Sequence, residues 1–330
     1  MTEIRLKDLR IEEEYSLGGL EVAVEKVGDN KKFKPITITK NGTYEGGIED
    51  GKQVGFNPVV VDVKPDKAAV VKELINARGN ANCLFETPYN AGMTTKVTDE
   101  IIAEHIRFDT LENAEEAASM YRGCHNITEV PLTNTSKVRS FTQHFQYCYA
   151  LLEAPKYDIS GTNTLITVWA HCRALITLPD YDSETAHILD VTTAFYQCIS
   201  LRIFPAWDLR GCANYNNAFG GCGKLEDVRI KNVKANIVFS QSPLLSKGSA
   251  IHLLYECRDT GSAKTITFST ETGKLLADVY VKSIPITDEM RAEDDLVDEK
   301  LPFVVCEPTD EGATLITQYV LQKNWQVAYA

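Results

Sequence analysis

Cysteine and histidine are the residues of this chain with the clearest chemical potential, because a thiolate is a nucleophile and both residue types bind metals. The 330-residue chain has nine cysteines and six histidines. His171 directly precedes Cys172, which raises the possibility of a base and a nucleophile. Adjacent residues on a helix do not face each other, however, and a cysteine at an apolar repeat position is expected to be buried and unreactive. We therefore predict structural histidines and no catalytic residue.

Metal and cofactor sites are not predicted either. The cysteines outside the repeat described below lack the Cys-x-x-Cys spacing of a zinc site; they are Cys83, Cys212, Cys257 and Cys306. Residues 288–300 are rich in carboxylates, but the Asp-x-Asp-x-Asp-Gly spacing of a calcium loop is missing. We interpret this stretch as a solvated loop or helix face, with a metal-binding loop as the alternative. The sequence also has no Gly-x-Ser-x-Gly, His-Glu-x-x-His or Gly-x-x-x-x-Gly-Lys motif.

The spacing of the remaining five cysteines is the strongest signal in the chain. Each lies three residues after an aromatic residue, and successive cysteines are 24, 24, 26 and 24 residues apart. The five pairs are Tyr121/Cys124, Phe145/Cys148, Trp169/Cys172, Phe195/Cys198 and Phe219/Cys222. If each pair lies on a helical turn, its two side chains point to the same face. These ten residues are therefore predicted to form the structural core of an internal repeat, with cysteine packing as a small hydrophobic residue.

Other positions recur in register with the cysteines. An aliphatic residue follows three positions later at Ile127, Leu151, Leu175, Leu201 and Leu225. A second apolar column follows at Val130, Ala154, Leu178, Phe204 and Val228, and in the first four units a proline comes next. An Asx column then stands at Asn134, Asp158, Asp182, Asp208 and Asn232. Such a side chain can accept a hydrogen bond from the main chain two residues on and turn the chain out of a strand.

A repeat of this length favours an α/β fold in which each unit contributes one short strand and one helical turn. This is the leucine-rich-repeat arrangement, in which neighbouring units must stack to bury their apolar faces. The units Cys172 to Asp182 and Ala194 to Leu201 resemble BspA-like leucine-rich repeats, which occur in bacterial surface proteins and in phage tail proteins. The resemblance covers about 120 residues. Unlike the usual pattern, the residue before each aromatic is variable.

A second resemblance concerns residues 36–44 and 55–63. The segments Ile-Thr-Ile-Thr-Lys-Asn-Gly-Thr-Tyr and Gly-Phe-Asn-Pro-Val-Val-Val-Asp-Val are similar to a segment that recurs in phage tail and baseplate proteins. Their β-branched residues predict two strands, with a turn at Asn41-Gly42 and with Pro58 near the start of the second strand. The resemblance implies a virion setting.

One aromatic column is a candidate ligand-contact surface. Tyr157, Tyr181 and Trp207 recur once per unit on the expected strand side, where their rings could stack on envelope sugars. In related repeats this column is usually leucine, and Thr133 and Lys231 hold the position in the first and last units. Core packing is the alternative interpretation, and we favour it.

Charge and hydropathy exclude several classes. A formal net charge of −12 argues against a protein that tracks nucleic-acid phosphates. No run of about 18 apolar residues predicts a membrane span, and the first residues lack the apolar core of an export signal. We expect thiols rather than disulfides, because a phage protein assembles in the host cytoplasm.

The expected organisation has four parts. Residues 1–66 form an N-terminal β-rich anchoring module, with a further strand within 20–27, and residues 67–79 a linker helix that begins at an Asp66 N-cap and ends at Gly79. Residues 80–260 form the solenoid, whose irregular first unit has a strand at 106–109 and a helix at 111–121. Residues 261–330 form a capping region. Closing elements are expected at 244–255, Lys264–Phe268, 312–322 and Trp325–Tyr329.

The sequence thus predicts a non-enzymatic phage structural protein of the tail or baseplate, located in the virion. Its expected partners are other tail proteins and a host-surface protein or glycan, and tail symmetry implies a homo-oligomer. A bacterial surface or secreted adhesin is the first alternative. A phage-borne envelope-degrading enzyme is the second, although no pair of carboxylates stands out for that chemistry.

Overall fold

The computed structural model describes residues 66–87 and 97–330, and also the backbone of six short strands within residues 20–61. The chain divides into two compact units, Met1–Leu74 and Ile75–Ala330. The boundaries expected after residues 79 and 260 both lie within the second unit.

The strands of the first unit form three antiparallel pairs. β1 (Leu20–Val22) pairs with β2 (Ile36–Ile38), β3 (Gly42–Tyr44) with β6 (Val59–Val61), and β4 (Ile48–Glu49) with β5 (Lys52–Gln53). Strands are thus found within both segments that resemble phage proteins. Asn41 of the expected turn, Pro58 and most of the segment 20–27 lie outside the described residues.

A helix, α1 (Lys67–Arg78), lies where the linker helix was expected, and the boundary between the two units falls within it. The Asp66 carboxylate accepts hydrogen bonds from the main-chain N–H groups of Ala68 and Ala69, as an N-cap does. Gly79 ends the helix with a φ of 73°, a conformation that suits glycine. A second helix, α2 (Asp99–His105), was not expected from the sequence; Thr98 caps it through the N–H of Ile101.

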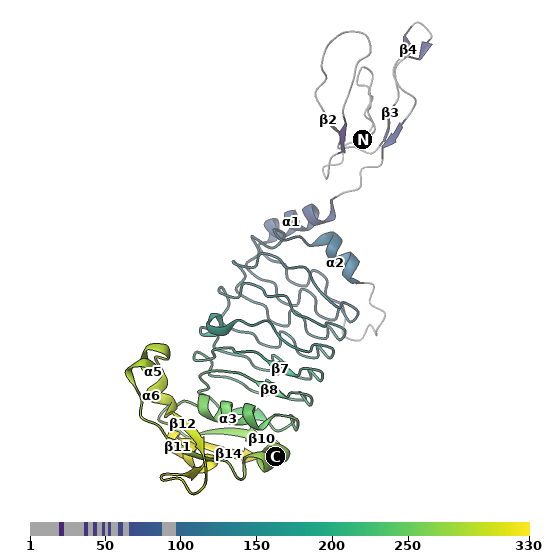
Figure 1. Cartoon of the computed structure of the whole chain (residues 1–330). Coiled ribbons are helices and arrows are strands. Elements are labelled where there is room, and N and C mark those ends of the chain that lie inside the picture. Colours follow the sequence, from purple (N-terminus) through teal and green to yellow (C-terminus); the bar gives the residue numbers. More distant parts are fainter. Residues whose placement is uncertain are drawn as a thin grey trace. The chain divides into compact units, whose positions relative to one another are not determined.

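Successive coils of main chain then stack on one another between α2 and α3 (Lys247–Glu256), as Figure 1 shows. Isolated parallel bridges join neighbouring coils: one column runs through Glu153, Thr177 and Ile203, and a second through Thr164, Asp190 and Asn214. The first column ends in the parallel pair β7 (Ile203–Phe204) and β8 (Asp227–Val228). A 3₁₀ turn at Asp182–Thr185 interrupts the coils once. The strand side is therefore made mostly of single bridges.

The aromatic-x-x-Cys segments do not form the expected helical turns. Two residues with positive φ accompany each segment, one directly before the cysteine and one two positions before the aromatic residue, such as Gln197 (61°) and Thr193 (50°) at Phe195–Cys198. This conformation directs main-chain N–H groups to the next coil: Phe195 donates to Ala218 at 3.1 Å, and Gln197 to Gly220 at 2.7 Å. Neighbouring coils therefore satisfy one another's main chains.

Two predictions for the first unit are wrong. The helix expected at 111–121 is absent, and the segment consists of turns. Ala117, Ser119 and Tyr121 donate their N–H groups to carbonyl oxygens of the following coil at 2.9–3.0 Å, so these three groups are not available for helical bonds. The strand expected at 106–109 is also absent; a local turn, closed by Thr110 N–H to the Arg107 carbonyl at 3.1 Å, replaces it.

Two side-chain ladders run through the coils. Aromatic rings stack between several pairs of successive coils, with centroids 5.6 Å apart for Trp169 and Phe195 and 5.4 Å for Phe195 and Phe219. Each repeat cysteine donates its thiol to the carbonyl of the aromatic residue one coil earlier; for Cys198 and Trp169 the distance is 3.1 Å. The ten residues predicted as repeat core are all at most 3% exposed.

The ring ladder is longer than the five repeats detected in the sequence. Phe85 stacks on Tyr121 at 5.5 Å, and Phe219 is followed by Phe239 at 4.8 Å and Phe268 at 6.3 Å. Phe239 is followed three residues later by Ser242, whose hydroxyl donates to the Cys222 carbonyl at 3.1 Å. Serine thus takes the cysteine position in an additional coil.

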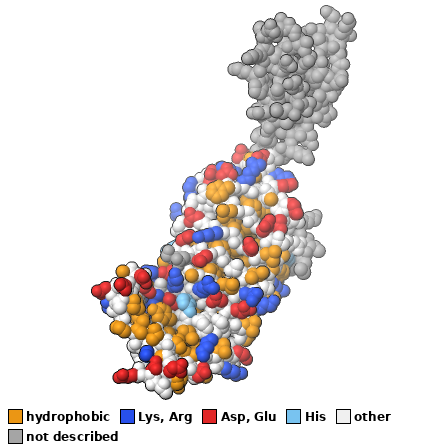
Figure 2. Space-filling model, in the orientation of Figure 1, with side chains coloured by type: hydrophobic (Ala, Val, Ile, Leu, Met, Phe, Trp, Pro, Cys, Tyr) orange, Lys and Arg blue, Asp and Glu red, His pale blue; other side chains and the backbone are white. Residues whose placement is uncertain are grey.

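Two small sheets follow the coils. β9 (Ile237–Phe239), β10 (Lys264–Phe268) and β14 (Trp325–Tyr329) are parallel, with β10 in the middle. β11 (Tyr280–Ser283) lies between β12 (Phe303–Cys306) and β13 (Thr314–Leu315) in an antiparallel sheet. Figure 2 shows hydrophobic side chains gathered over this region, and Val305 of the edge strand β12 is 57% exposed.

The helices of this region are short. Ser246 caps α3, within the segment predicted as helical, and Ser269 caps α4 (Thr270–Leu276). α5 (Asp288–Glu293) and α6 (Val297–Lys300) hold the acidic stretch. In place of one helix at 312–322 there are β13, α7 (Ile316–Tyr319) and a 3₁₀ turn at Val320–Lys323. The strands predicted at Lys264–Phe268 and Trp325–Tyr329 are confirmed.

The ring ladder is expected to dominate the stability of the coils. Phe195→Ala removes a fully buried ring between Trp169 and Phe219 and should lower the free energy of unfolding by about 3–5 kcal/mol. Phe108→Ala is the matched control, because that ring is 62% exposed; its effect should stay within about 0.5 kcal/mol. Urea unfolding of both variants checks this, and equal losses would contradict it.

Candidate functional site

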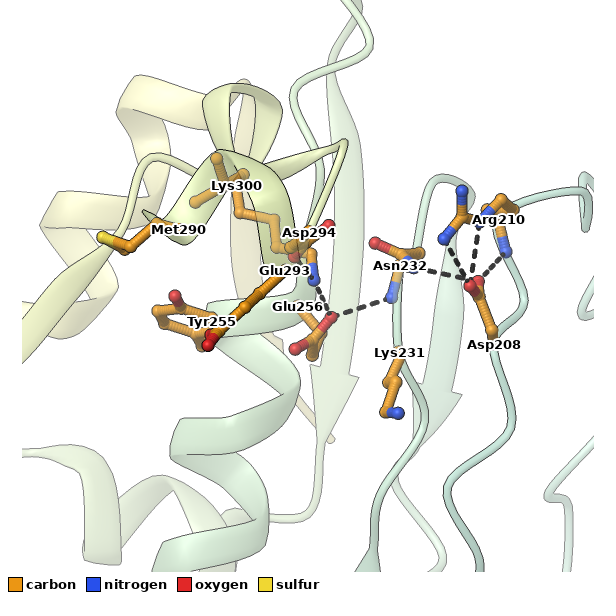
Figure 3. Close-up of a pocket in the computed structure, with 11 residues that line it drawn as sticks. Asp208, Arg210, Lys231, Asn232, Tyr255, Glu256, Met290, Glu293, Asp294 and Lys300 are labelled. Atoms are coloured by element: carbon orange, nitrogen blue, oxygen red, sulfur yellow. Dashed lines mark hydrogen bonds and ion pairs between the residues drawn. The ribbon is translucent and has the colours of Figure 1, made fainter. Parts of the chain in front are cut away.

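A polar cleft of about 450 Å³ lies where the last coils meet α3, α5 and α6 (Figure 3). Coil residues Asp208, Arg210 and Asn232 line one side, and Glu256 at the end of α3 lies between them and Lys300 of α6. The cleft thus collects charged side chains from segments about 90 residues apart in the sequence.

Asp208 organises the coil side of the cleft. Its carboxylate accepts hydrogen bonds from the Arg210 guanidinium at 2.8 Å, from the Arg210 main-chain N–H at 3.0 Å and from the Asn232 side chain at 2.9 Å. Burial opposes ionisation, but these donors hold the pKa of Asp208 below its usual value. Asp208 therefore stays ionised and cannot act as a general acid near neutral pH.

Lys300 organises the other side. Its ammonium lies 2.8 Å from a Glu256 oxygen and 2.5 Å from an Asp294 oxygen, although the Lys300 side chain is only 4% exposed. Burial disfavours the charge, but the two carboxylates raise the pKa of Lys300. The same Glu256 oxygen accepts the main-chain N–H of Asn232 at 2.9 Å, so the two sides of the cleft form one network.

The acidic stretch 288–300 is bound to the coils more tightly than a solvated loop would be. The Arg210 guanidinium donates to both Asp295 oxygens at 3.0 Å, and Arg258 donates to Glu299 from its Nε at 2.7 Å. Asp288 and Glu293 are exposed, as expected for a solvated face. Among the described residues there is no group of three side chains placed to hold a metal ion. The metal-loop alternative thus finds no support in the geometry.

The candidate ligand-contact column lies inside the coils. Tyr157, Tyr181 and Trp207 are 5%, 1% and 0% exposed, and the Trp207 indole donates to the Pro179 carbonyl at 2.9 Å. Such rings have no free face for an external sugar. The core interpretation agrees with this burial, whereas the ligand-contact interpretation does not.

The His171-Cys172 pair is not arranged for nucleophilic catalysis. Cys172 is fully buried, its thiol donates to the Phe145 carbonyl at 3.2 Å, and burial raises its pKa well above the usual value. His144 is also fully buried and bonds the Ala117 carbonyl through Nδ1. Burial lowers the pKa of His144 to about 4, so the ring is neutral at physiological pH.

His171 instead belongs to a half-exposed surface feature that the sequence analysis missed. We define the aromatic stripe as Tyr147, Tyr149, His171 and Tyr196, which are half-exposed; the buried ring of His125 packs against Tyr149 beneath them. Tyr147 stacks on His171 at 4.7 Å, Tyr196 meets His171 edge-on at 5.3 Å, and His125 stacks on Tyr149 at 4.6 Å. The exposed Arg173 guanidinium lies over the Tyr149 ring at 4.5 Å. The repeat register contained the signal, because these residues lie one or two positions from the repeat cysteines.

Comparison with known proteins identifies no relative of this chain. No protein-family model matches the chain, and no curated protein or solved structure matches it significantly. In the described part of the chain, no helix has the length and apolar character needed to cross a bilayer. Function is therefore inferred from the chain's own residues.

The buried network predicts a large cost for removing its cation. Lys300→Met leaves Glu256 and Asp294 facing each other without a counter-charge and should cost roughly 3 kcal/mol of unfolding free energy. Lys247→Met breaks an exposed ion pair with Asp278 and should cost about 0.5 kcal/mol or less. Similar losses in urea unfolding would show that the network contributes little.

His144 makes stability depend on pH with a defined sign. Because its folded-state pKa lies below the unfolded value, the unfolded chain takes up the proton first, and stability falls as pH drops below about 6.5. Between about pH 6.5 and pH 5 the loss should be roughly 1.5 kcal/mol. His144→Gln lacks this titration, so the variant should show a flatter profile in urea unfolding. Parallel profiles would refute the assignment.

Proposed function

We propose that this chain is a non-enzymatic structural protein of a phage tail or baseplate, whose coils are leucine-rich repeats that make protein–protein or host-surface contacts. The observation that carries the contact role is the aromatic stripe: tyrosine and histidine rings held half-exposed by neighbouring coils. Tyrosine and arginine are enriched at binding hot spots, since they offer large contact areas and polar groups together. The virion setting is supported by the resemblance of residues 36–44 and 55–63 to phage proteins.

The rigidity of the stripe is favourable for binding. Its rings contact one another and arise from coils that share main-chain hydrogen bonds, such as His171 N–H to the Tyr196 carbonyl at 2.7 Å. Side chains that are already ordered lose less entropy on association. The chain's net charge of −12 favours partners with basic patches through long-range attraction. Tail symmetry would make the chain a homo-oligomer in the particle.

The two alternatives are less well supported. A glycosidase needs a carboxylic acid whose pKa is raised so that it can protonate the leaving group. In the cleft, the pKa values of Asp208 and Asp294 are lowered by their hydrogen bonds, although burial acts in the opposite direction. A bacterial surface or secreted adhesin would use the same stripe, and only the location of the protein distinguishes it from a tail protein.

The first test is localisation of the chain on purified particles by immunogold labelling or cryo-microscopy. We expect density at the tail tip or baseplate. Absence from particles together with labelling of the bacterial surface would replace the phage proposal with the adhesin.

Particles that carry stripe variants then test the contact role. The double variant Tyr149→Ser, Tyr196→Ser should either reduce adsorption to host cells at least tenfold or release the partner tail protein, because both rings are half-exposed. Phe108→Ser, at an exposed ring outside the stripe, should leave both unchanged. Normal assembly and adsorption of the stripe variant would exclude the stripe as the contact surface.

A further inference from the structure

Asn232 presents an unfilled hydrogen-bond acceptor in the polar cleft. Its side chain is 2% exposed, and its Nδ2 donates to Asp208 at 2.9 Å. Its Oδ1 is buried as well and accepts no hydrogen bond from any residue that the structure describes. Leaving a buried acceptor unpaired costs free energy, so such a group favours a ligand that brings a donor.

The charges of the cleft argue against an ionic ligand. Its lining holds four carboxylates and three basic groups, which leaves one net negative charge. Arg210 and Lys300 already have carboxylate partners at 2.5–3.0 Å, so neither is available to hold an anion without losing one. The Lys300 ammonium also stands between Glu256 and Asp294, where a metal cation would need those carboxylates. A neutral ligand fits this balance best.

The size of the cleft and the residues of its walls indicate which chemical class of ligand it could bind. A volume of about 450 Å³ is within the range of small-molecule sites. Tyr255 and Met290 lie together on the side of the cleft opposite Asp208 and form its apolar wall (Figure 3). Sugar rings combine hydroxyl donors with an apolar C–H face, so they match an unfilled acceptor that lies opposite an aromatic wall.

We propose that the cleft binds a neutral saccharide unit, with a sugar hydroxyl donating to Asn232 Oδ1. This inference deepens the proposed host-surface contact and rests on it for the source of the saccharide. The binding itself is a property of the isolated chain. If the cleft does not bind sugars, the protein can still be located on particles. If the protein is absent from particles, the isolated chain can still bind a sugar. The two failures are therefore distinguishable.

Saturation-transfer NMR on the full chain provides the test, with glucose, galactose, rhamnose and N-acetylglucosamine as separate probes. N-acetylglycinamide serves as a peptide-like donor. At least one sugar should bind, and Asn232→Gly should weaken it about tenfold because the acceptor is lost. Glycine tolerates the 60° φ of this position. The matched control is Asn217→Gly, at an exposed asparagine with a φ of 52° outside the cleft, and it should bind like the wild type.

A second variant keeps the test decisive if Asn232→Gly fails to fold. Met290→Trp should fill the cleft and abolish the sugar signal, whereas Glu289→Trp, at the preceding exposed position of α5, should not. The proposal is overturned if none of the four sugars binds or if Asn232→Gly and Met290→Trp both bind like the wild type. Binding of N-acetylglycinamide alone would also overturn it, in favour of a peptide ligand.

Discussion

The structure from residue 75 onward depends on hydrogen bonds that each coil can complete only against its neighbour. Residues with positive φ, two per repeat, keep the aromatic segments from forming a continuous helix, and only turn bonds such as that from Cys148 N–H to the Phe145 carbonyl remain within a coil. N–H groups of these segments therefore reach the next coil, as Phe145 does to Val168 at 2.8 Å, and the cysteine thiols reach back to the previous one. A single coil would leave these donors and its stacked ring exposed to water. Stability is consequently a property of the stack, as in other repeat proteins.

This dependence explains the spacing of the sequence. A ring such as Phe195 must lie over Trp169 while Cys198 reaches the Trp169 carbonyl, so the number of residues per coil can vary only where the chain is away from both ladders. The one step of 26 residues, between Cys172 and Cys198, contains the 3₁₀ turn at Asp182–Thr185. The two additional residues of that step are thus accommodated in the same coil as a local turn, and the ladders continue without interruption.

Sequence patterns predicted the residues that recur in every coil. They did not predict where bonds between coils replace local secondary structure. Burial of the aromatic and cysteine columns follows from their period, and the Asx column does bond its own main chain two residues on at Asn134, Asp158 and Asp208. The helix expected at 111–121 had good local propensity, but bonds to the next coil replaced it. The additional coil at Phe239 escaped detection because Ser242 stands in the cysteine position. No local pattern could place Lys300 beside Glu256, because that contact depends on how the segment after the coils folds back on them.

Near the end of the stack, side chains accept and donate hydrogen bonds that the main chain makes in other coils. This difference explains why a polar cleft forms there. In the coil of Asp208 the Asx side chain accepts the N–H of Arg210, whereas Asn232 has a φ of 60° and its carboxamide instead donates to Asp208. Its own N–H bonds the Glu256 carboxylate rather than a carbonyl of another coil. A carboxylate at that position needs a counter-charge, which Lys300 supplies from α6. These side-chain contacts form a buried polar network with one acceptor, Asn232 Oδ1, that none of the described residues satisfies. The unpaired acceptor is therefore a consequence of the side-chain contacts that join Asn232 to Asp208 and Glu256.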